Sequence, residues 1–412
     1  MTNKVRYIFL LFNIMYSVFN TNAQNKGQLA AEQLFQQSHK AICYGGYRSN
    51  SRNIQPTILQ IKEDLKILQA LDIKFIRMYN VHLVETQNVL NAIRELKREN
   101  KSFEMYLMLG AWIDCKNAWT EHEPIHSEES ARNETEIKEA VRLANEYPEI
   151  VKVISVGNEA MVRWADKYFV EPEIILKWVE YLQNLKKNHQ LSKSVWITSS
   201  DNFASWGGES SYHNETLEKL CHAVDYISIH TYPMHDTYYN SVFWGVNEDE
   251  TYLSKKEQLN TLMYRAVDYA QNQYKSVKNY LKSHHIDKPV HIGETGWATK
   301  SGNHYGNEGS MATDEYKEAI YYHSMMEWSK KEGITIFYFE AFDEIWKDVN
   351  HTNGSENHFG LFTIDGKAKY AMWSEVDKGT FKNLSRDGNP IVKTYNGDEE
   401  LLLNDVKIKY RN

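Results

Sequence analysis

The chain has 412 residues, of which 42% are hydrophobic and 25% charged, a composition typical of a globular protein with a large core. Its net charge of −8 and isoelectric point near 6.1 argue against nucleic acid or an anionic membrane as the main partner, since both reward clustered Lys and Arg. The 11 Trp and 27 Tyr exceed what packing usually needs, and such rings suit a flat, half-apolar ligand, although core packing accounts for many of them.

The first residues have the pattern of a secretory signal. Lys4 and Arg6 precede an apolar run over residues 8–19, and small residues lead up to Ala23. The alternative is a plain N-terminal helix. We expect residues 1–23 to be removed on export, which places the mature protein outside the cell or in the periplasm. No other stretch is long and apolar enough to span a membrane, so we expect no membrane association of the mature form.

Further along the chain, short apolar runs alternate with longer amphipathic stretches, which is typical of repeated strand–helix units. The expected strands are residues 41–47, 74–79, 105–112, 151–156, 195–199, 226–230, 289–293 and 334–339. The expected helices are residues 57–71, 84–99, 134–147, 173–188, 256–282 and 314–331. Eight strands with helical crossovers predict an α/β fold, a (β/α)8 TIM barrel over residues 24–378.

The pattern weakens towards the C-terminus. Residues 379–412 are polar and contain turn signals at 387–390 and 396–398, so we expect a short extension packed on the barrel. The chain has three cysteines, which cannot all pair and match no metal motif. Stability is therefore expected to come from the core and not from disulfide bonds. Separately, the protein is expected to be a monomer.

Two of the expected strands lead directly into a carboxylate. Glu159 follows Val-Ile-Ser-Val-Gly-Asn, and Glu294 follows Pro-Val-His-Ile-Gly. The carboxyl ends of barrel strands meet on one face, so these two side chains are expected to become neighbours. Gly157 and Gly293 are expected to let the backbone bend so that each Glu projects into the barrel mouth. The alternative is that each Glu only caps the next helix.

A pair of carboxyl groups suits cleavage of a glycosidic bond. One protonated carboxyl can protonate the leaving oxygen while an ionised one stabilises or attacks the sugar carbon. Burial and a neighbouring negative charge would keep the acid protonated near neutral pH. If the pair works by retention, the two groups should lie about 5 to 5.5 Å apart, against roughly 6.5 to 9.5 Å for inversion.

Five motifs resemble glycoside hydrolase family 17, the β-1,3-glucanases, and they occur in the family's order over about residues 41 to 375. They are Ala41-Ile-Cys-Tyr-Gly-Gly-Tyr-Arg48, Ile76-Arg-Met-Tyr79, Ser155-Val-Gly-Asn-Glu159, His291-Ile-Gly-Glu-Thr-Gly-Trp297 and Phe339-Glu-Ala-Phe-Asp-Glu-Ile-Trp-Lys347.

This resemblance implies a retaining mechanism, with Glu159 as general acid/base and Glu294 as nucleophile. It implies that the Asn158 amide bonds the sugar 2-hydroxyl. Further substrate contacts are expected from Tyr44, Tyr79, Tyr232, Glu344 and Lys347. Asn80 and Ile345 depart from residues common in relatives, and these departures bear on substrate contacts more than on the chemistry.

Aromatic side chains near strand ends are candidates for stacking on glucose rings. The favoured set is Trp112, Trp206, Trp297 and Trp346, with core packing as the alternative for each. No His-x3-His or His-Glu-x2-His spacing supports a metal site, and no cofactor is expected. The oxygen-rich segment 348–356 matches no known calcium loop, so a solvated turn is favoured there.

The resulting hypothesis is an exported enzyme that hydrolyses internal β-1,3 bonds of a glucan such as laminarin. A glucosyltransferase on the same fold is the first alternative, because a sugar hydroxyl can replace water in attacking the glycosyl-enzyme. A noncatalytic glucan-binding barrel is the second, although such a protein would be expected to have lost one carboxylate.

Overall fold

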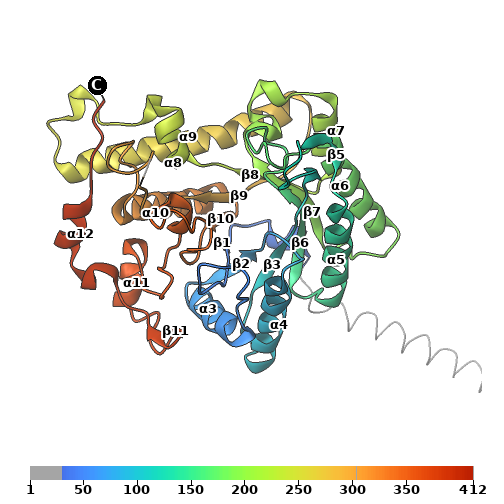
Figure 1. The fold of residues 1–412 in the computed structure, drawn as a ribbon, viewed down its shortest axis with the longest axis horizontal. Helices are drawn as coiled ribbons and strands as arrows, with labels where there is room; N and C mark the ends of the chain where they lie inside the picture. Colours follow the sequence, from blue (N-terminus) through green and yellow to red (C-terminus); the bar gives the residue numbers. More distant parts are fainter. Residues whose placement is uncertain (1–29, 303, 412) are drawn as a thin grey trace, which may run out of the picture.

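In the structure, a computed structural model that describes residues 30–302 and 304–411, eight parallel strands close into a barrel (Figure 1). The predicted TIM barrel is therefore confirmed. Each strand pairs with its neighbours in chain order, and β10 closes the ring by pairing with β1. The strands are β1 (Lys40–Cys43), β2 (Ile73–Arg77), β3 (Tyr106–Ala111), β6 (Val151–Asn158), β7 (Trp196–Asn202), β8 (Ile227–His230), β9 (Val290–Gly296) and β10 (Ile336–Phe339).

All six expected helices are present within one or two residues of their predicted ends. They are α3 (Ile58–Ala70), α4 (Val84–Glu99), α5 (Arg132–Glu146), α6 (Pro172–Lys187), α9 (Lys255–Ser283) and α10 (Glu315–Glu332). The local signals explain the boundaries of α10. The Asp314 side chain accepts from the Lys317 amide at its start, and Gly333 ends it in a left-handed conformation (φ 69°).

Several shorter helices were not predicted, because their apolar repeats are too brief to show a period. They are α2 (Ala31–Leu34), α7 (Glu215–Ala223), α8 (Pro233–Tyr239), α11 (Trp373–Asp377) and α12 (Glu399–Asp405). Of these, α8 lies inside the aromatic segment that follows β8, with Pro233 in its first turn. The simple alternation of one helix per strand is thus broken after β8, which is followed by both α8 and α9.

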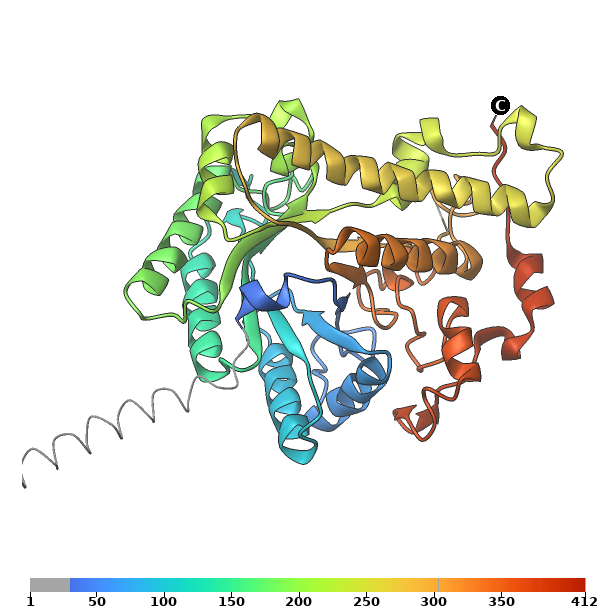
Figure 2. The same ribbon diagram turned by 180° about the vertical axis from the view of Figure 1, so that it is seen from behind.

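The helices surround the barrel on all sides and leave one end of it open. Helices α3 to α6 lie on one side, and α9 and α10 lie on the other (Figures 1 and 2). The opposite end is closed by Phe35, which follows α2. Its ring lies 5.0 Å from that of Phe75 and 5.2 Å from that of Trp196, measured between centroids. Since Trp196 begins β7, this aromatic plug seals the end where the strands start and leaves the carboxyl ends accessible.

The C-terminal residues contact the helices that surround the barrel. Strands β11 (Ser385–Arg386) and β12 (Asn389–Pro390) form a hairpin beside α3, and Leu402 of α12 packs with Leu259 of α9. The last residues run along the loop before α9, where the Val246 amide donates to the Lys409 carbonyl at 2.8 Å.

A buried ionic cluster joins this C-terminal hairpin to the first strand. Asp64 of α3, which is fully buried, accepts from Arg386 at 3.0 Å and from Arg48 at 2.7 Å. Asp64 also accepts from the Tyr44 hydroxyl at 2.9 Å. Two arginines and a tyrosine thus share one carboxylate, and the residues just after β1 are held in place by a side chain that comes 322 positions after Asp64.

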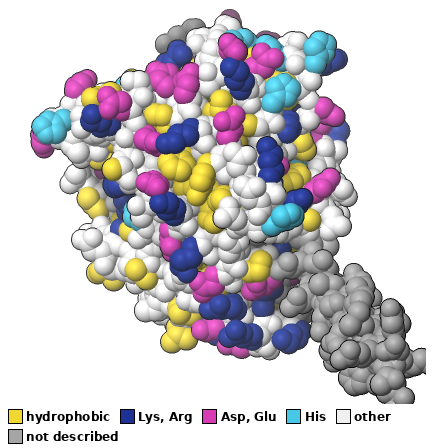
Figure 3. All heavy atoms as spheres, turned by 90° about the vertical axis from the view of Figure 1, so that its right-hand side faces the viewer, with side chains coloured by type: hydrophobic (Ala, Val, Ile, Leu, Met, Phe, Trp, Pro, Cys, Tyr) yellow, Lys and Arg dark blue, Asp and Glu magenta, His cyan; other side chains and the backbone are white. Residues whose placement is uncertain are grey.

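Within the described residues, Cys43, Cys115 and Cys221 are all buried and unpaired. Among the helices of residues 30–302 and 304–411, none has the length and apolar character needed to cross a membrane. The face in Figure 3 carries acidic and basic side chains intermixed, without a continuous basic stripe. The proposed signal at residues 1–23 lies outside the described residues.

Candidate active site

The two carboxylates predicted from the sequence lie at the open end of the barrel. Glu294 is part of β9, and its side chain is buried, with the residue 7% exposed. Glu159 comes directly after β6 in a left-handed conformation (φ 45°), and its side chain is 24% exposed. A non-glycine residue in this conformation is strained, and such strain often occurs at functional sites.

The glycines before the two carboxylates have different reasons for being glycine. Gly157 adopts φ 82° and bends the chain ahead of Glu159, as predicted. At Gly293 the register of β9 shifts against both neighbouring strands, β8 and β10, so the strand is locally irregular there. A Cβ atom at Gly293 would lie 2.2 Å from the hydroxyls of Ser200 and Ser228, so glycine is required there for space inside the barrel.

Glu294 accepts hydrogen bonds at both carboxylate oxygens. Tyr232 donates to Oε1 at 2.6 Å, while Tyr79 at 2.9 Å and the Arg77 guanidinium at 2.6 Å donate to Oε2. Burial would raise the pKa of Glu294, but the electrostatic effects of His230 and Arg77 and the hydrogen bonds from the two tyrosines outweigh it and hold the pKa below its ordinary value. Glu294 is therefore kept ionised.

Arg77 is the central residue that the sequence analysis did not identify as part of the site. Its second guanidinium nitrogen donates to Oδ1 of Asn158 at 2.5 Å while the first binds Glu294. Because Oδ1 is an acceptor here, the amide NH2 of Asn158 is the group offered to a ligand. The sequence did contain a signal for Arg77, because this residue lies in the motif Ile76-Arg-Met-Tyr79 at the end of β2. An arginine at a strand end is a candidate for the open end of the barrel.

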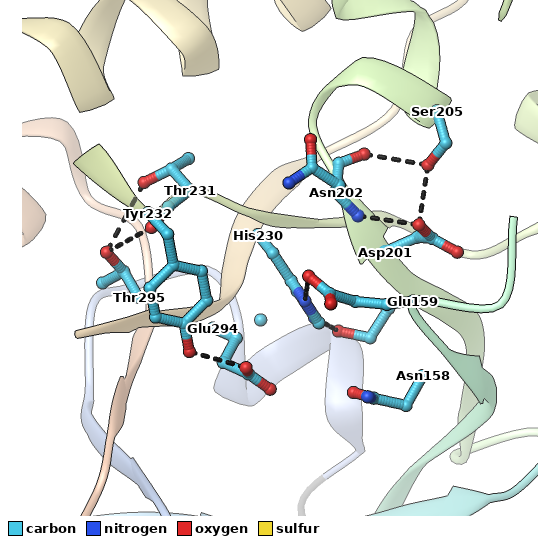
Figure 4. A network of polar contacts seen from close by, with 12 residues as sticks. Asn158, Glu159, Asp201, Asn202, Ser205, His230, Thr231, Tyr232, Glu294 and Thr295 are labelled. Atoms are coloured by element: carbon cyan, nitrogen blue, oxygen red, sulfur yellow. Dashed lines mark hydrogen bonds and ion pairs between the residues drawn. The ribbon is translucent and has the colours of Figure 1, made fainter. Parts of the chain in front are cut away.

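His230 and Asp201 are further polar residues that surround Glu159 (Figure 4). The Nδ1 atom of His230 lies 3.0 Å from Oε1 of Glu159, and its Nε2 lies 2.8 Å from the Ser200 hydroxyl. Asp201 accepts from the Met161 amide at 2.7 Å, which fixes the turn after Glu159. Burial, and to a lesser degree the charge of Glu159, raises the pKa of Asp201 to about 6.

Two cavities meet at the carboxylates. The first, which we call the α8 arm, has a volume of about 690 Å³ and is lined by residues that include Trp164, Phe203, Tyr232, His235, Asp236, Tyr239, Tyr269 and Gln273. The second, the β2 arm, has a volume of about 560 Å³ and is lined by residues that include Tyr44, Tyr47, Tyr79, Trp112, Trp119, Asn158, Trp346 and Lys347. Glu159, Glu294, Phe339 and Glu356 line both arms. The carboxylates therefore lie where one cleft divides into two arms.

The acidic and basic pair expected after the last strand lies in the β2 arm, together with a third charged residue. Lys347 contacts Glu344 at 3.0 Å and also binds both oxygens of Glu340, at 2.8 and 2.7 Å. Burial and the charge of Glu344 raise the pKa of Glu340 well above its ordinary value, which Lys347 only partly offsets. In Glu344 the effect of burial is outweighed, chiefly by Lys347, so the pKa of Glu344 is lowered. The two carboxyls thus share one lysine, and their pKa values are displaced in opposite directions.

Of the other expected substrate contacts, some lie in the cleft and some do not. Trp112 and Trp346 line the β2 arm, and the Trp346 indole donates to Glu344 at 2.9 Å. Tyr44 also lines this arm, but its hydroxyl is engaged by Asp64.

The predictions for Trp206 and Trp297 were wrong, because both rings are fully buried and line neither arm. Trp206 lies in the irregular helical turn after β7, and the Trp297 indole donates to the Ala312 carbonyl at 2.8 Å. A strand end supplies core residues as well as cleft residues, which the sequence pattern does not separate.

The oxygen-rich segment 348–356 forms an internally bonded turn. The Asp348 carboxylate accepts from the backbone amide of His351 at 3.2 Å and lies 2.9 Å from its ring, while Asn357 donates to the Asp348 carbonyl at 2.8 Å. Within the described residues, no group of three or more His, Cys, Asp and Glu side chains is arranged to hold a metal ion.

Comparisons with known proteins agree with this geometry. A domain model described as "BtgE/BtgC glycoside hydrolase domain" matches residues 41–360. The chain is similar to a glucan 1,3-beta-glucosidase of Arthroderma benhamiae, with 27% identity over 68% of this chain and 75% of that one. A probable glucan endo-1,3-beta-glucosidase of Aspergillus terreus is 25% identical over 74% of this chain, which spans only 40% of that relative's length.

Among solved structures, an endo-laminarinase from Formosa Hel1_33_131 is 60% identical, with a TM-score of 0.90, and the match covers 90% of this chain and 95% of that one. A glycoside hydrolase family 17 beta-1,3-glucanosyltransferase from Rhizomucor miehei has a TM-score of 0.56 at 20% identity, covering 81% and 96% of the two chains. The second likeness concerns the fold alone.

Proposed function

Because this chain belongs to the BtgE/BtgC glycoside hydrolases of family 17, we propose that it is an endo-acting hydrolase of laminarin-type β-1,3-glucan. The observation that carries this proposal is the position of two carboxylates at the junction of a two-armed cleft. The similarity to an endo-laminarinase at 60% identity supports the same substrate and the same internal cleavage.

In the proposed mechanism, Glu294 is the nucleophile and Glu159 the general acid/base. The Glu294 carboxylate attacks the anomeric carbon while the Glu159 proton passes to the oxygen of the departing glucan, so that a glycosyl-enzyme and a shortened chain result. Glu159, now ionised, takes a proton from water as the water oxygen displaces Glu294, which returns both groups to their starting state.

The environments of the two carboxyls support this division of roles. A nucleophile must be ionised, and the contacts of Arg77, Tyr79 and Tyr232 keep Glu294 in that state. An acid/base must exchange protons with both substrate and water, and Glu159 is the more exposed of the two. A separation of about 5 to 5.5 Å between the carboxyl groups remains the prediction for a retaining pair.

The two arms are assigned by Asn158, which lines the β2 arm and not the α8 arm. If its amide bonds the 2-hydroxyl of the sugar under attack, the non-reducing side of the glucan occupies the β2 arm. The departing side then occupies the α8 arm. A cleft that continues on both sides of the scissile bond accepts the interior of a polymer, which favours endo action.

Export of the protein is part of the proposal. The charged and apolar pattern of residues 1–23 supports a cleaved signal, and a β-glucan polymer is a substrate met outside the cell. Amino-terminal sequencing of the secreted protein tests this directly: a mature start at Gln24 is expected, and recovery of Met1 on the exported protein would contradict it.

The function is tested by following reducing ends released from laminarin by wild type, Glu294→Gln and Glu159→Gln. We expect each variant to lose at least about 1,000-fold in kcat while keeping its fold and its glucan binding, since one half of the acid–nucleophile pair is missing. Glu180→Gln, on the outer face of α6, is the matched control and should match wild type. Unchanged turnover in either site variant would refute its assigned role.

Azide separates the two roles. With Glu294→Gly, azide should restore cleavage and give a glycosyl azide of inverted configuration, because it replaces the missing nucleophile. With Glu159→Gly, the azide product should retain configuration. Product sizing in the same reactions distinguishes hydrolysis, which raises reducing ends, from transfer, which redistributes chain lengths without raising them.

A further inference from the structure

The α8 arm contains a buried acceptor that the mechanism does not use. Gln273 of α9 lines this arm and is 6% exposed. Its Oε1 atom has no hydrogen-bond partner among residues 30–302 and 304–411, whereas its Nε2 donates to Oδ2 of Asp236 at 3.3 Å. A buried carbonyl oxygen without a donor is energetically unfavourable, and a ligand that donates to it removes this penalty.

The neighbours of Gln273 make this part of the arm rich in acceptors. Asp236 of α8 lines the arm, and its Oδ1 accepts from Asn240 at 2.6 Å. Tyr269 lies one turn before Gln273 on α9, and burial followed by the charge of Asp236 raises the pKa of its phenol to about 12. The phenol thus stays neutral and can donate or accept.

This position lies beyond the carboxylates in the α8 arm. Tyr232, which donates to Glu294, comes directly before α8, and Asp236 follows in the first turn of that helix. The rings of Tyr232 and His235 stack at 5.2 Å and form part of the wall between the two points. An aromatic wall beside a pair of acceptors suits a glucose unit, which offers an apolar face and a row of hydroxyl donors.

We propose that Gln273 and Asp236 form a distal subsite that binds a glucosyl residue of the departing glucan, with Gln273 Oε1 and the Asp236 carboxylate accepting from its hydroxyls. This inference rests on the proposed function and on its assignment of the α8 arm to the departing side. It makes Gln273 a determinant of chain-length preference, because only a substrate with several sugars beyond the scissile bond reaches it.

The test compares two substrates in Gln273→Met, which keeps the length of the side chain and removes the acceptor. Laminarihexaose extends into the α8 arm, whereas an aryl β-laminaribioside places sugars only in the β2 arm. We expect kcat/KM to fall roughly tenfold on laminarihexaose, the loss of one hydrogen bond to a buried partner, and to change less than about twofold on the aryl glycoside. Asp236→Asn, which keeps an acceptor oxygen, should lose less on laminarihexaose.

The matched control is Gln271→Met on the same helix, two positions away and lining neither arm, which should resemble wild type on both substrates. An equal loss on both substrates would overturn the proposal by showing a structural role, as would no loss on either. If the loss appeared only with aryl glycosides and grew with the number of their sugars, Gln273 would act on the non-reducing side of the glucan. That result would also overturn the proposal. Failure of the proposed function gives a different result, namely no cleavage of either substrate by wild type.

Discussion

Replacing Tyr232 by Phe removes the hydrogen bond of 2.6 Å to Oε1 of Glu294 and leaves the ring against His235. A hydrogen bond to a charged group contributes about 1.5 to 3 kcal/mol, and 1.36 kcal/mol corresponds to one pKa unit. Because this bond lowers the pKa of Glu294, its loss should raise that pKa by about 1 to 2 units. The nucleophile would then be protonated, and inactive, at a higher pH than in wild type.

The measurement is kcat/KM against pH with an aryl β-laminaribioside, whose acidic limb reports the free enzyme. We expect this limb to move to higher pH by the same 1 to 2 units. Tyr79→Phe, which removes the bond of 2.9 Å to Oε2, should act in the same direction. Tyr47→Phe is the control, because its hydroxyl faces Gln55 and does not contact Glu294. Acidic limbs that stay in place in both variants, with the fold intact, would refute our account of how Glu294 is kept ionised.

Three further outcomes are expected. Arg77→Lys keeps the charge but cannot bind Glu294 and Asn158 together, so kcat/KM on laminarin should fall roughly 10- to 100-fold, and a change below twofold would contradict the bridging role. Arg386→Met leaves Asp64 short of one buried partner and should lower the free energy of unfolding in urea by about 3 kcal/mol, whereas Lys382→Met at an exposed position should not. Trp206→Ala should lower the free energy of unfolding by about 3 to 5 kcal/mol, because it leaves a cavity in the core. Trp112→Ala should weaken laminarin binding several-fold with little change in Tm. Weakened binding without loss of stability in Trp206→Ala, and the opposite in Trp112→Ala, would contradict the burial of Trp206.

The barrel could be predicted from the sequence because its strands are continuous apolar runs and its long helices have clear caps. The same regularity predicted that Glu159 and Glu294 come together, since strand order in a closed barrel determines which residues share its open end. The short helices α7 and α8 follow no repeat long enough to detect, and Pro233 suggests a turn as readily as a helix start.

The finer structure of the site depends on direction and distance, which a linear pattern does not contain. Arg77 and His230 sit at strand ends like many core residues, and only the folded barrel shows that both reach the carboxylates. Trp206 and Trp297 are the opposite case. Their positions near strand ends suggested that they line the cleft, but both rings are packed in the core. A bend was predicted at Gly293, where the structure shows a register shift of β9 and, in addition, two serine hydroxyls that leave no space for a Cβ atom.

The tie between Asp64 and Arg386 has a consequence for how the enzyme is made. When the ribosome has completed the first three strands, Arg386, which pairs with Asp64, has not yet been synthesised. Strand β1 also lacks its second neighbour, β10, at that stage. The part of the β2 arm around Tyr44 can therefore reach its final structure only when the chain is almost entirely synthesised. A catalytic groove assembled last, from residues at distant ends of the polypeptide, would stay inactive until synthesis is complete.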